Sequence, residues 1–203
     1  MKIICIGRNY ILHAKELNNE APFEPIYFMK PDSALLLKNN PFYIPDFSKE
    51  IHYETEIVVR INKVGKNIQQ KFAHTYYNEF ALGVDFTARD IQAQLKSKGL
   101  PWEKAKGFDQ SAVLSKMVDI KTFKNIKDID FSLDKNGRTV QKGNSGDMTF
   151  SIDYLISYIS QYMTLKIGDL IYTGTPAGVG KVEIGDNLVG IMNGEKMFDF
   201  KIK

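Results

Sequence analysis

The segment from Tyr53 to Ile61 constrains the fold most, because it combines a dense run of β-branched residues with two acidic side chains, Glu54 and Glu56. Side chains two positions apart on a strand project from the same face, so these two carboxylates are expected to lie side by side. On a strand with one wet face such a pair is simply solvated. The apolar continuation Ile57-Val58-Val59 instead favours a strand covered on both faces, where unpaired carboxylates are costly unless a cation compensates them.

A third acidic residue, Asp85, interrupts the apolar run from Phe80 to Phe86. A charge has no packing role in such a run, so Asp85 is the expected third member of the same site. Three oxygen ligands suit Mg²⁺ or Mn²⁺ better than Zn²⁺. The single cysteine, Cys5, excludes a site built from several thiolates.

The composition is that of an ordinary globular protein, with 203 residues of which 43% are hydrophobic and 25% charged, and it predicts one domain spanning residues 1–203. The net charge of +3 is mild and the lysines are scattered, so no nucleic acid is expected as a partner. The apolar run near the N-terminus is too short to span a membrane. With one cysteine and no intrachain disulfide, these features predict a soluble protein of the cytoplasm.

Local patterns predict a strand-rich α+β protein. Strands are expected over Ile3–Ile6, Ile26–Met29, Tyr53–Ile61 and Phe80–Phe86, and helices over Tyr10–Leu17, Ala88–Lys98 and Ile152–Tyr162, the last with Ser151 as N-cap. Asn136-Gly137 and Asn193-Gly194 each stand between strand-like runs and favour a tight hairpin, because both residue types accept a positive φ. The C-terminal third is therefore expected to be mainly antiparallel sheet.

Residues that follow Asp85 are suited to binding an anion. Arg89 and Gln92 are three positions apart in the expected helix and so share a face, although an ordinary solvated helix start is the alternative. Lys104 and Lys106 come next, and one of them is placed to stabilise a developing enolate.

His13 and Glu16 stand three positions apart in the first expected helix. This spacing lets the carboxylate orient the imidazole as a general base. The same spacing is common by chance, and a surface pair is the alternative. His52 and His74 show no comparable partner in the sequence.

The glycine-rich segment from Gly174 to Lys181 departs from a nucleotide-binding loop, because Thr175 stands where that pattern needs glycine and Val182 follows Lys181. A turn of this kind still brings backbone amides and the Thr175 side chain close to a ligand. The alternative is a turn that only connects two elements and contacts no ligand.

Taken together and in order, these segments resemble the fumarylacetoacetate hydrolase family. The resemblance runs through nearly the whole chain and is carried by five motifs: Gly7-Arg8-Asn9-Tyr10 with His13 and Glu16, Phe28-Met29-Lys30-Pro31, Tyr53-Glu54-Thr55-Glu56, Thr87-Ala88-Arg89-Asp90, and Thr173 to Gly180. The short length and the segment from Lys98 to Lys106 are most similar to its acylpyruvase and oxaloacetate decarboxylase branch.

The resemblance implies a mixed β-roll with a few peripheral helices, usually assembled as a homodimer. It implies roles for ten residues. By resemblance, Glu54, Glu56 and Asp85 bind Mg²⁺ or Mn²⁺, His13, Glu16 and Lys106 are catalytic, and Arg8, Arg89, Gln92 and Thr175 line the substrate site.

The implied activity is metal-dependent chemistry on a small 2-oxo acid through an enolate. Hydrolysis of acylpyruvates, decarboxylation of oxaloacetate and its tautomerisation all pass through that enolate, and activation of water separates the first from the others. The alternatives are an isomerase of 2-hydroxyhepta-2,4-diene-1,7-dioate or a related hydratase, and a non-catalytic metal- or ligand-binding domain on the same scaffold.

Overall fold

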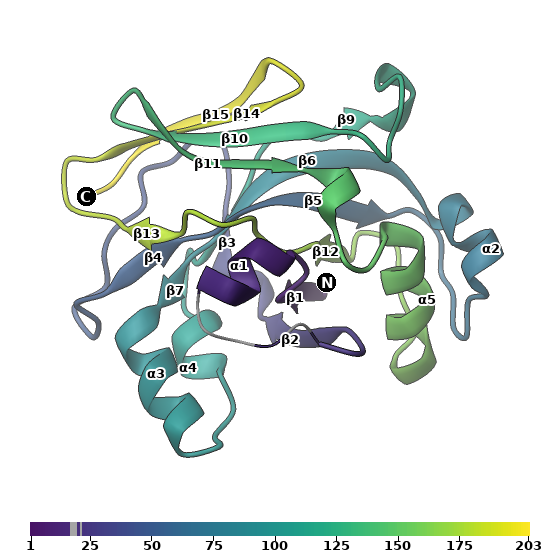
Figure 1. The fold of residues 1–203 in the computed structure, drawn as a ribbon, viewed down its shortest axis with the longest axis horizontal. Coiled ribbons are helices and arrows are strands. Elements are labelled where there is room, and N and C mark those ends of the chain that lie inside the picture. Colours follow the sequence, from purple (N-terminus) through teal and green to yellow (C-terminus); the bar gives the residue numbers. More distant parts are fainter. Residues whose placement is uncertain (17–19, 21) are drawn as a thin grey trace.

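The computed structural model describes residues 1–16, 20 and 22–203, and strands dominate them (Figure 1). The largest sheet is mixed, with parallel pairs β1–β12 and β3–β8 and an antiparallel pair β5–β6. Its order is β2 (Ile26–Lys30), β1 (Ile3–Gly7), β12 (Leu170–Tyr172), β5 (Thr55–Ile61), β6 (Tyr77–Asp85), β8 (Ala112–Leu114) and β3 (Leu35–Leu36), with β9 (Val118–Asp119) paired to β6.

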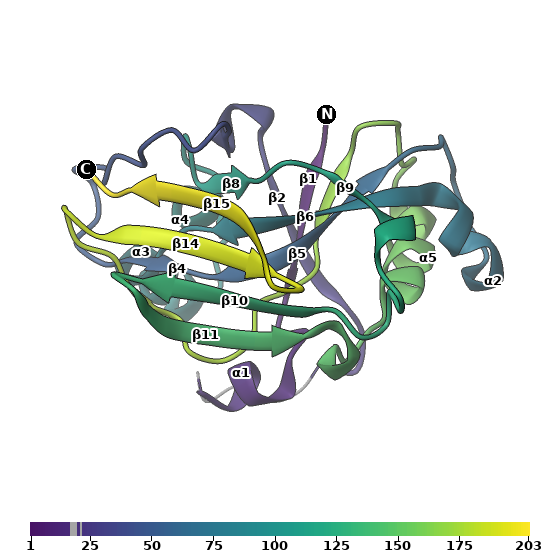
Figure 2. The same cartoon turned by 90° about the horizontal axis from the view of Figure 1, so that it is seen from above.

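The second sheet is antiparallel and comes from the C-terminal third, as expected. Its order is β11 (Arg138–Asn144), β10 (Asp130–Lys135), β14 (Asn187–Met192) and β15 (Glu195–Lys201). The β10–β11 and β14–β15 hairpins turn at Asn136-Gly137 and Asn193-Gly194, where all four residues have positive φ. Both predicted hairpins are therefore confirmed, and they appear at the ends of the layer in the foreground of Figure 2.

Three short strands and the helices complete the fold. The strands β13 (Gly180–Lys181), β4 (Ile51–Tyr53) and β7 (Thr87–Ala88) form a small third sheet. The helices are α1 (Ile11–Glu16), α2 (Gln70–Ala73), α3 (Arg89–Ser97), α4 (Glu103–Lys106) and α5 (Ile152–Tyr162), with 3₁₀ turns at Asp32–Ala34, His74–Tyr76, Ile120–Thr122 and Ser145–Asp147. Among the described residues, no helix is long and apolar enough to cross a membrane.

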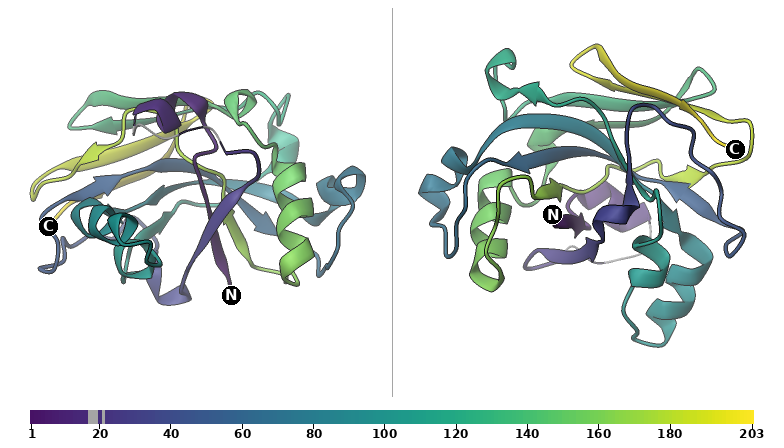
Figure 3. Two further views of the ribbon diagram at one scale, coloured as in Figure 1. Left: turned by 60° about the horizontal axis from the view of Figure 1, so that its bottom comes forward. Right: turned by 180° about the vertical axis from the view of Figure 1, so that it is seen from behind.

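The antiparallel sheet lies over one side of β5 and β6, while α3 and α4 lie on the other side, as the views in Figures 1 and 3 agree. Strand β5 is covered on both faces, as two clusters of buried residues show. Ile57 and Val59 pack into a cluster that includes Phe131 of the antiparallel sheet, and Val58 packs into a second cluster with Cys5. The expected doubly covered strand is confirmed, so carboxylates at its start are buried.

Several predicted elements have different boundaries. The run from Tyr53 to Ile61 is not one strand, because β4 ends at Tyr53, Glu54 lies between strands, and β5 begins at Thr55. The helix expected from Ala88 begins at Arg89, because Ala88 pairs with Ile51 in the third sheet.

The two other predicted helices are present. The first covers Ile11–Glu16, and the expected last residue, Leu17, lies outside the described residues. The last covers Ile152–Tyr162 as predicted, and the Ser151 side chain accepts a hydrogen bond from the Tyr154 backbone N–H at 3.3 Å. The α+β fold with a mixed sheet and few helices agrees with the expectation.

Candidate active site

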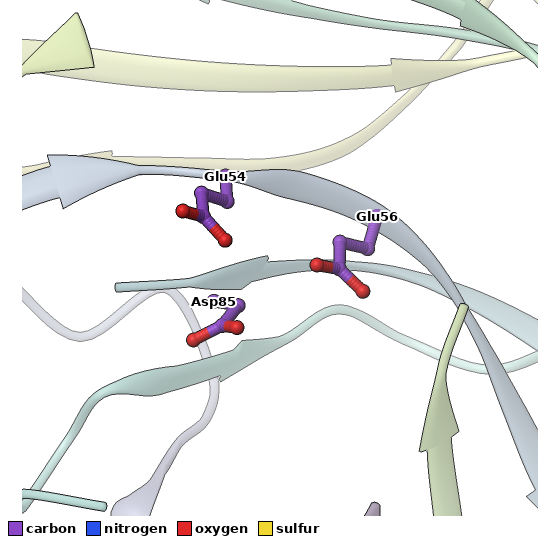
Figure 4. A group of neighbouring side chains, drawn as sticks. All are labelled: Glu54, Glu56 and Asp85. Atoms are coloured by element: carbon purple, nitrogen blue, oxygen red, sulfur yellow. The ribbon is translucent and has the colours of Figure 1, made fainter. Parts of the chain in front are cut away.

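Three buried carboxylates meet where β5 begins and β6 ends (Figure 4). Each of Glu54, Glu56 and Asp85 is at most 6% exposed, and one oxygen from each lies within 4.8 Å of the others. The backbone brings them together, because the Asp85 N–H donates to the Glu54 carbonyl oxygen at 2.8 Å and the register places Glu56 beside Gly83. The structure therefore assembles the three acidic residues that the sequence singled out.

Two cations of the cavity hold this acidic group. The Lys106 ammonium of α4 lies 2.8 Å from Glu54 Oε2 and 2.7 Å from Asp85 Oδ2. The Arg89 guanidinium of α3 pairs with Glu54 Oε1 and donates to Gln92 Oε1 at 2.6 Å. Arg89 and Gln92 thus share a helix face, as their spacing predicted. Of the two candidate lysines, Lys104 and Lys106, it is Lys106 that contacts the acidic residues.

A third cation, Lys30 at the end of β2, was given no role from the sequence. Its ammonium lies 2.7 Å from Asp85 Oδ1, and the side chain is fully buried. The sequence did contain an indication of this role, because Lys30 is the last residue of the strand-forming run that begins at Ile26. A charged side chain in such a run needs a buried partner. Nothing local indicated that the partner is Asp85, which is 55 positions away.

The electrostatics separate the three carboxylates. Burial alone would raise the pKa of Glu54, but Lys106 and Arg89 hold it well below its usual value. Burial raises the pKa of Glu56 well above its usual value, and the charges of Asp85 and Glu54 raise it further. Glu56 takes part in none of the ion pairs among the described residues, and its one polar contact is the Gly174 backbone N–H at 2.7 Å.

This donor set fits a divalent cation. Three buried carboxylate oxygens converge, Glu56 lacks a positive partner among the described residues, and oxygen ligands are those that Mg²⁺ and Mn²⁺ prefer. A cation there would relieve the repulsion that raises the pKa of Glu56.

The histidine and glutamate of α1 form a pair beside the acidic group. His13 Nδ1 lies 3.3 Å from Glu16 Oε2, and His13 is only 5% exposed. Glu16 also accepts hydrogen bonds at 3.1 and 3.2 Å from the backbone N–H of Gly178 in the glycine-rich segment. The surface-pair alternative is wrong for His13, because its imidazole is buried against the site.

The glycine-rich segment serves the site mainly through its backbone. Gly174 adopts φ +102° and donates its N–H to Glu56. The Thr175 hydroxyl donates to the Thr55 carbonyl oxygen at 2.9 Å and accepts from Gln141 Nε2 at 2.8 Å. Its only proton is therefore used within the protein, and Gln141 is a further residue that the sequence did not identify.

These groups face one small cavity of about 40 Å³. It is lined by Ile6, Gly7, Arg8, His13, Phe28, Glu54, Glu56, Arg89, Gln92, Lys96, Trp102, Lys106 and Thr175. Eight of the ten residues assigned by resemblance line this cavity. The other two contact residues of the lining: Glu16 contacts His13, and Asp85 contacts Lys106. Larger hollows of about 390 and 770 Å³ lie against the antiparallel sheet, but none of the three acidic residues lines them.

His52 was wrongly taken to lack a partner. Its Nε2 lies 3.3 Å from Glu50 Oε2, and burial together with the Arg89 charge lowers the pKa of the imidazole. Lys181 pairs with the same carboxylate at 3.3 Å. This group lies outside the cavity lining, so it adds nothing to the candidate active site.

The sequence profile of the family described as fumarylacetoacetate (FAA) hydrolase C-terminal matches residues 2–198. The chain belongs to this family. The resemblance of the five motifs is therefore confirmed, and the fumarylacetoacetate hydrolase fold accounts for the mixed sheet described above.

Two similar relatives are named as enzymes. The mitochondrial oxaloacetate decarboxylase of Dictyostelium discoideum is 44% identical over 91% of this chain and 85% of its own. The mitochondrial oxaloacetate tautomerase of Arabidopsis thaliana is 40% identical over 100% of this chain and 91% of its own. The expectation of an enzyme is confirmed.

A solved structure extends the similarity to a ligand-bound state. The fumarylpyruvate hydrolase of Pseudomonas aeruginosa, crystallised with Mn²⁺ and pyruvate, superposes with a TM-score of 0.94 at 31% identity, covering 100% of this chain and 89% of that one. A family enzyme of the same fold thus binds a divalent cation and a 2-oxo acid together.

Proposed function

We propose that this family member is a Mg²⁺- or Mn²⁺-dependent enzyme acting on small 2-oxo acids. The observation that carries the proposal is the cluster of three carboxylates with the Lys106 ammonium, beside a cavity that is also lined by His13, the partner of Glu16. No other described part of the chain brings together three or more groups suited to hold a cation.

The proposed cation ligands are Glu54, Glu56 and Asp85. When bound, the divalent cation would act as a Lewis acid on the 2-oxo group of the substrate. The Mn²⁺ and pyruvate of the fumarylpyruvate hydrolase support this assignment. Protein contacts orient both glutamates, because the Gly174 N–H donates to the Glu56 carboxylate and Lys106 and Arg89 pair with that of Glu54.

The proposed substrate contacts are cationic. Lys106 lines the cavity, and its ammonium is placed to stabilise the negative charge that develops on the oxo oxygen when carbon 3 gives up its carboxylate, acyl group or proton. Arg8 lines the same cavity and has φ +59°, a strained conformation for a non-glycine residue. Arg8, Arg89 and Gln92 would bind the carboxylate of the substrate.

His13 and Glu16 are the proposed general base. With Nδ1–H donated to Glu16, the other ring nitrogen, Nε2, is left to take a proton from water. The Gly178 N–H holds Glu16 in place, so the imidazole keeps one orientation. Removal of a carboxylate or a proton from carbon 3 does not need this water, whereas cleavage of an acyl group does.

Oxaloacetate is the proposed first substrate, because the Dictyostelium discoideum relative with 44% identity and the Arabidopsis thaliana relative with 40% identity are named for acting on it. Acylpyruvate hydrolysis is the second reaction of the same site, supported by the buried His13–Glu16 pair and by the name of the 31% identical neighbour.

The proposal is tested by assaying oxaloacetate and acetylpyruvate with Mg²⁺, with Mn²⁺ and with excess chelator. We expect turnover with either cation and none with chelator, and we expect Glu56→Ala to abolish turnover. The exposed Glu195→Ala is the matched control and should behave as wild type. Full activity in chelator would refute metal dependence, and turnover of only 2-hydroxyhepta-2,4-diene-1,7-dioate would favour the isomerase.

Binding of Mn²⁺ without turnover of any 2-oxo acid would favour the non-catalytic alternative. Three further predictions from the sequence are also proposals: a homodimer, a single domain over residues 1–203 and a cytoplasmic location. Light scattering after gel filtration, limited proteolysis and cell fractionation check them in turn. The mitochondrial location named for the curated relatives makes fractionation the informative measurement of the three.

A further inference from the structure

Lys30 is a buried cation that the proposed reaction does not use. Its side chain is fully buried, and its ammonium contacts Asp85 Oδ1 at 2.7 Å. The remaining contacts of the ammonium are to the carbonyl oxygens of Phe86, Lys106 and Ser111 and to the Ser111 hydroxyl. An ammonium group donates three hydrogen bonds, so this enclosure satisfies it completely.

The enclosure separates Lys30 from the substrate. Lys106 and Arg89 line the cavity, whereas Lys30 does not. Among the side chains of the candidate active site, Lys30 contacts Asp85, at Oδ1, while Lys106 contacts the other oxygen, Oδ2.

The effect of Lys30 on the metal site follows from the charges of the three acidic residues. Glu54, Glu56 and Asp85 carry three negative charges when ionised, and the Lys30 ammonium offsets one of them through its ion pair with Asp85. The two negative charges that remain are equal and opposite to the charge of a divalent cation. Lys106 and Arg89 also pair with Glu54 and Asp85, but both line the cavity that the negatively charged substrate would enter, whereas Lys30 does not.

We propose that Lys30 is the built-in counter-ion of the metal site, which sets its charge to match a divalent cation and so limits how tightly that cation binds. The proposal rests on the metal site of the proposed function. It makes Lys30 a positioning residue, because it acts on the cation through Asp85 and touches neither the cation nor the substrate.

Direct binding of Mn²⁺, measured by titration calorimetry on the full chain, tests the proposal. Lys30→Met removes the charge at similar length, and Lys30→Gln removes it while keeping a donor for the carbonyl oxygens. We expect both variants to bind Mn²⁺ more tightly by roughly tenfold or more, because the positive charge paired with the proposed ligand Asp85 is lost. Unchanged or weaker binding in both would overturn the proposal.

Two controls separate charge from packing. Ser111→Ala removes a hydrogen-bond partner of the same ammonium but keeps its charge, so Mn²⁺ affinity should stay within about twofold of wild type. Lys2→Met breaks another lysine–aspartate pair, in which Asp169 is 1% exposed, and should lower stability without changing Mn²⁺ affinity. A tenfold change in either control would show that packing, and not the Lys30 charge, controls affinity.

If the Lys30 variants lose their fold, the effect of Mn²⁺ on folding tests the proposal instead. A Lys30→Met chain that folds only when Mn²⁺ is present supports the proposal, because the cation then replaces the missing charge. A chain that stays unfolded with and without Mn²⁺ overturns it. Failure of wild type to bind Mn²⁺ would instead refute the proposed function, so the two failures are distinguishable.

Discussion

The two carboxylate oxygens of Glu16 share the backbone N–H of Gly178, a residue 162 positions further along the chain. Gly178 has φ +98°, and a side chain there would collide with the carbonyl oxygen of Val140. The glycine therefore allows the segment to approach β11 closely while its N–H points at the carboxylate. The orientation of His13 depends on this contact, because Glu16 is its partner.

Gly178→Ala is expected to shift the segment away from Val140 and to break the contact with Glu16. The strained φ and the collision should lower the free energy of unfolding by about 1–3 kcal/mol, and acetylpyruvate hydrolysis should fall. Gly185→Ala is a matched control, since Gly185 also has φ +98° but no atom lies within 4 Å of the added Cβ. Equal losses of hydrolysis in the two variants would show that backbone strain alone is responsible.

Glu16→Gln is expected to impair hydrolysis more than decarboxylation. The amide keeps the size of the carboxylate but loses the charge that stabilises a protonated imidazole, and general-base catalysis is worth about 10²-fold or more. Steady-state rates on acetylpyruvate and oxaloacetate give the ratio directly, with the exposed Glu103→Gln as control. If both reactions slow by the same factor, the division of labour between the pair and Lys106 is wrong.

The site was predictable wherever a local pattern carried it. Asp85 was found because a charge interrupts a buried run, and His13 with Glu16 because both stand on one turn of a helix. The boundaries of α5 and both hairpins followed from periodicity, capping and positive φ in the same way.

Features that depend on distant pairing were not predictable. The chain is interrupted at Glu54 because β4 pairs with β7 and β13 in the third sheet, whereas β5 belongs to the main sheet. No local pattern near Glu54 predicts this difference in pairing. Likewise, the sequence around Lys30 shows an unusual charge but not its partner Asp85. The structural use of the Thr175 hydroxyl depends on Gln141, which comes from a different sheet.

Gln141→Met is expected to destabilise the junction between the two main sheets. The Gln141 side chain is 1% exposed, accepts from the Thr55 N–H at 2.9 Å and donates to the Pro176 carbonyl oxygen at 3.0 Å. Both backbone groups would be left unpaired, which costs about 2–5 kcal/mol in total. Urea denaturation of this variant and of the exposed Gln94→Met measures the difference, and equal stabilities would contradict the role of Gln141.

Asn9→Ala is expected to uncouple the end of β1 from the glycine-rich segment. Asn9 is fully buried, and its side-chain amide donates to the carbonyl oxygens of Thr173 at 2.8 Å and Phe150 at 3.1 Å while its oxygen accepts from the Phe150 N–H at 2.8 Å. Loss of all three bonds should lower the free energy of unfolding by about 3 kcal/mol or more.

The same change should also weaken Mn²⁺ binding, because Thr173 precedes Gly174, whose N–H holds Glu56. Calorimetric titration with Mn²⁺, beside the exposed Asn78→Ala as control, checks this second effect. A destabilised Asn9→Ala protein with wild-type Mn²⁺ affinity would mean that Glu56 keeps its orientation without the Asn9 bridge. Weaker binding together with lower stability would place Asn9 among the residues that hold the metal site in shape from outside the cavity.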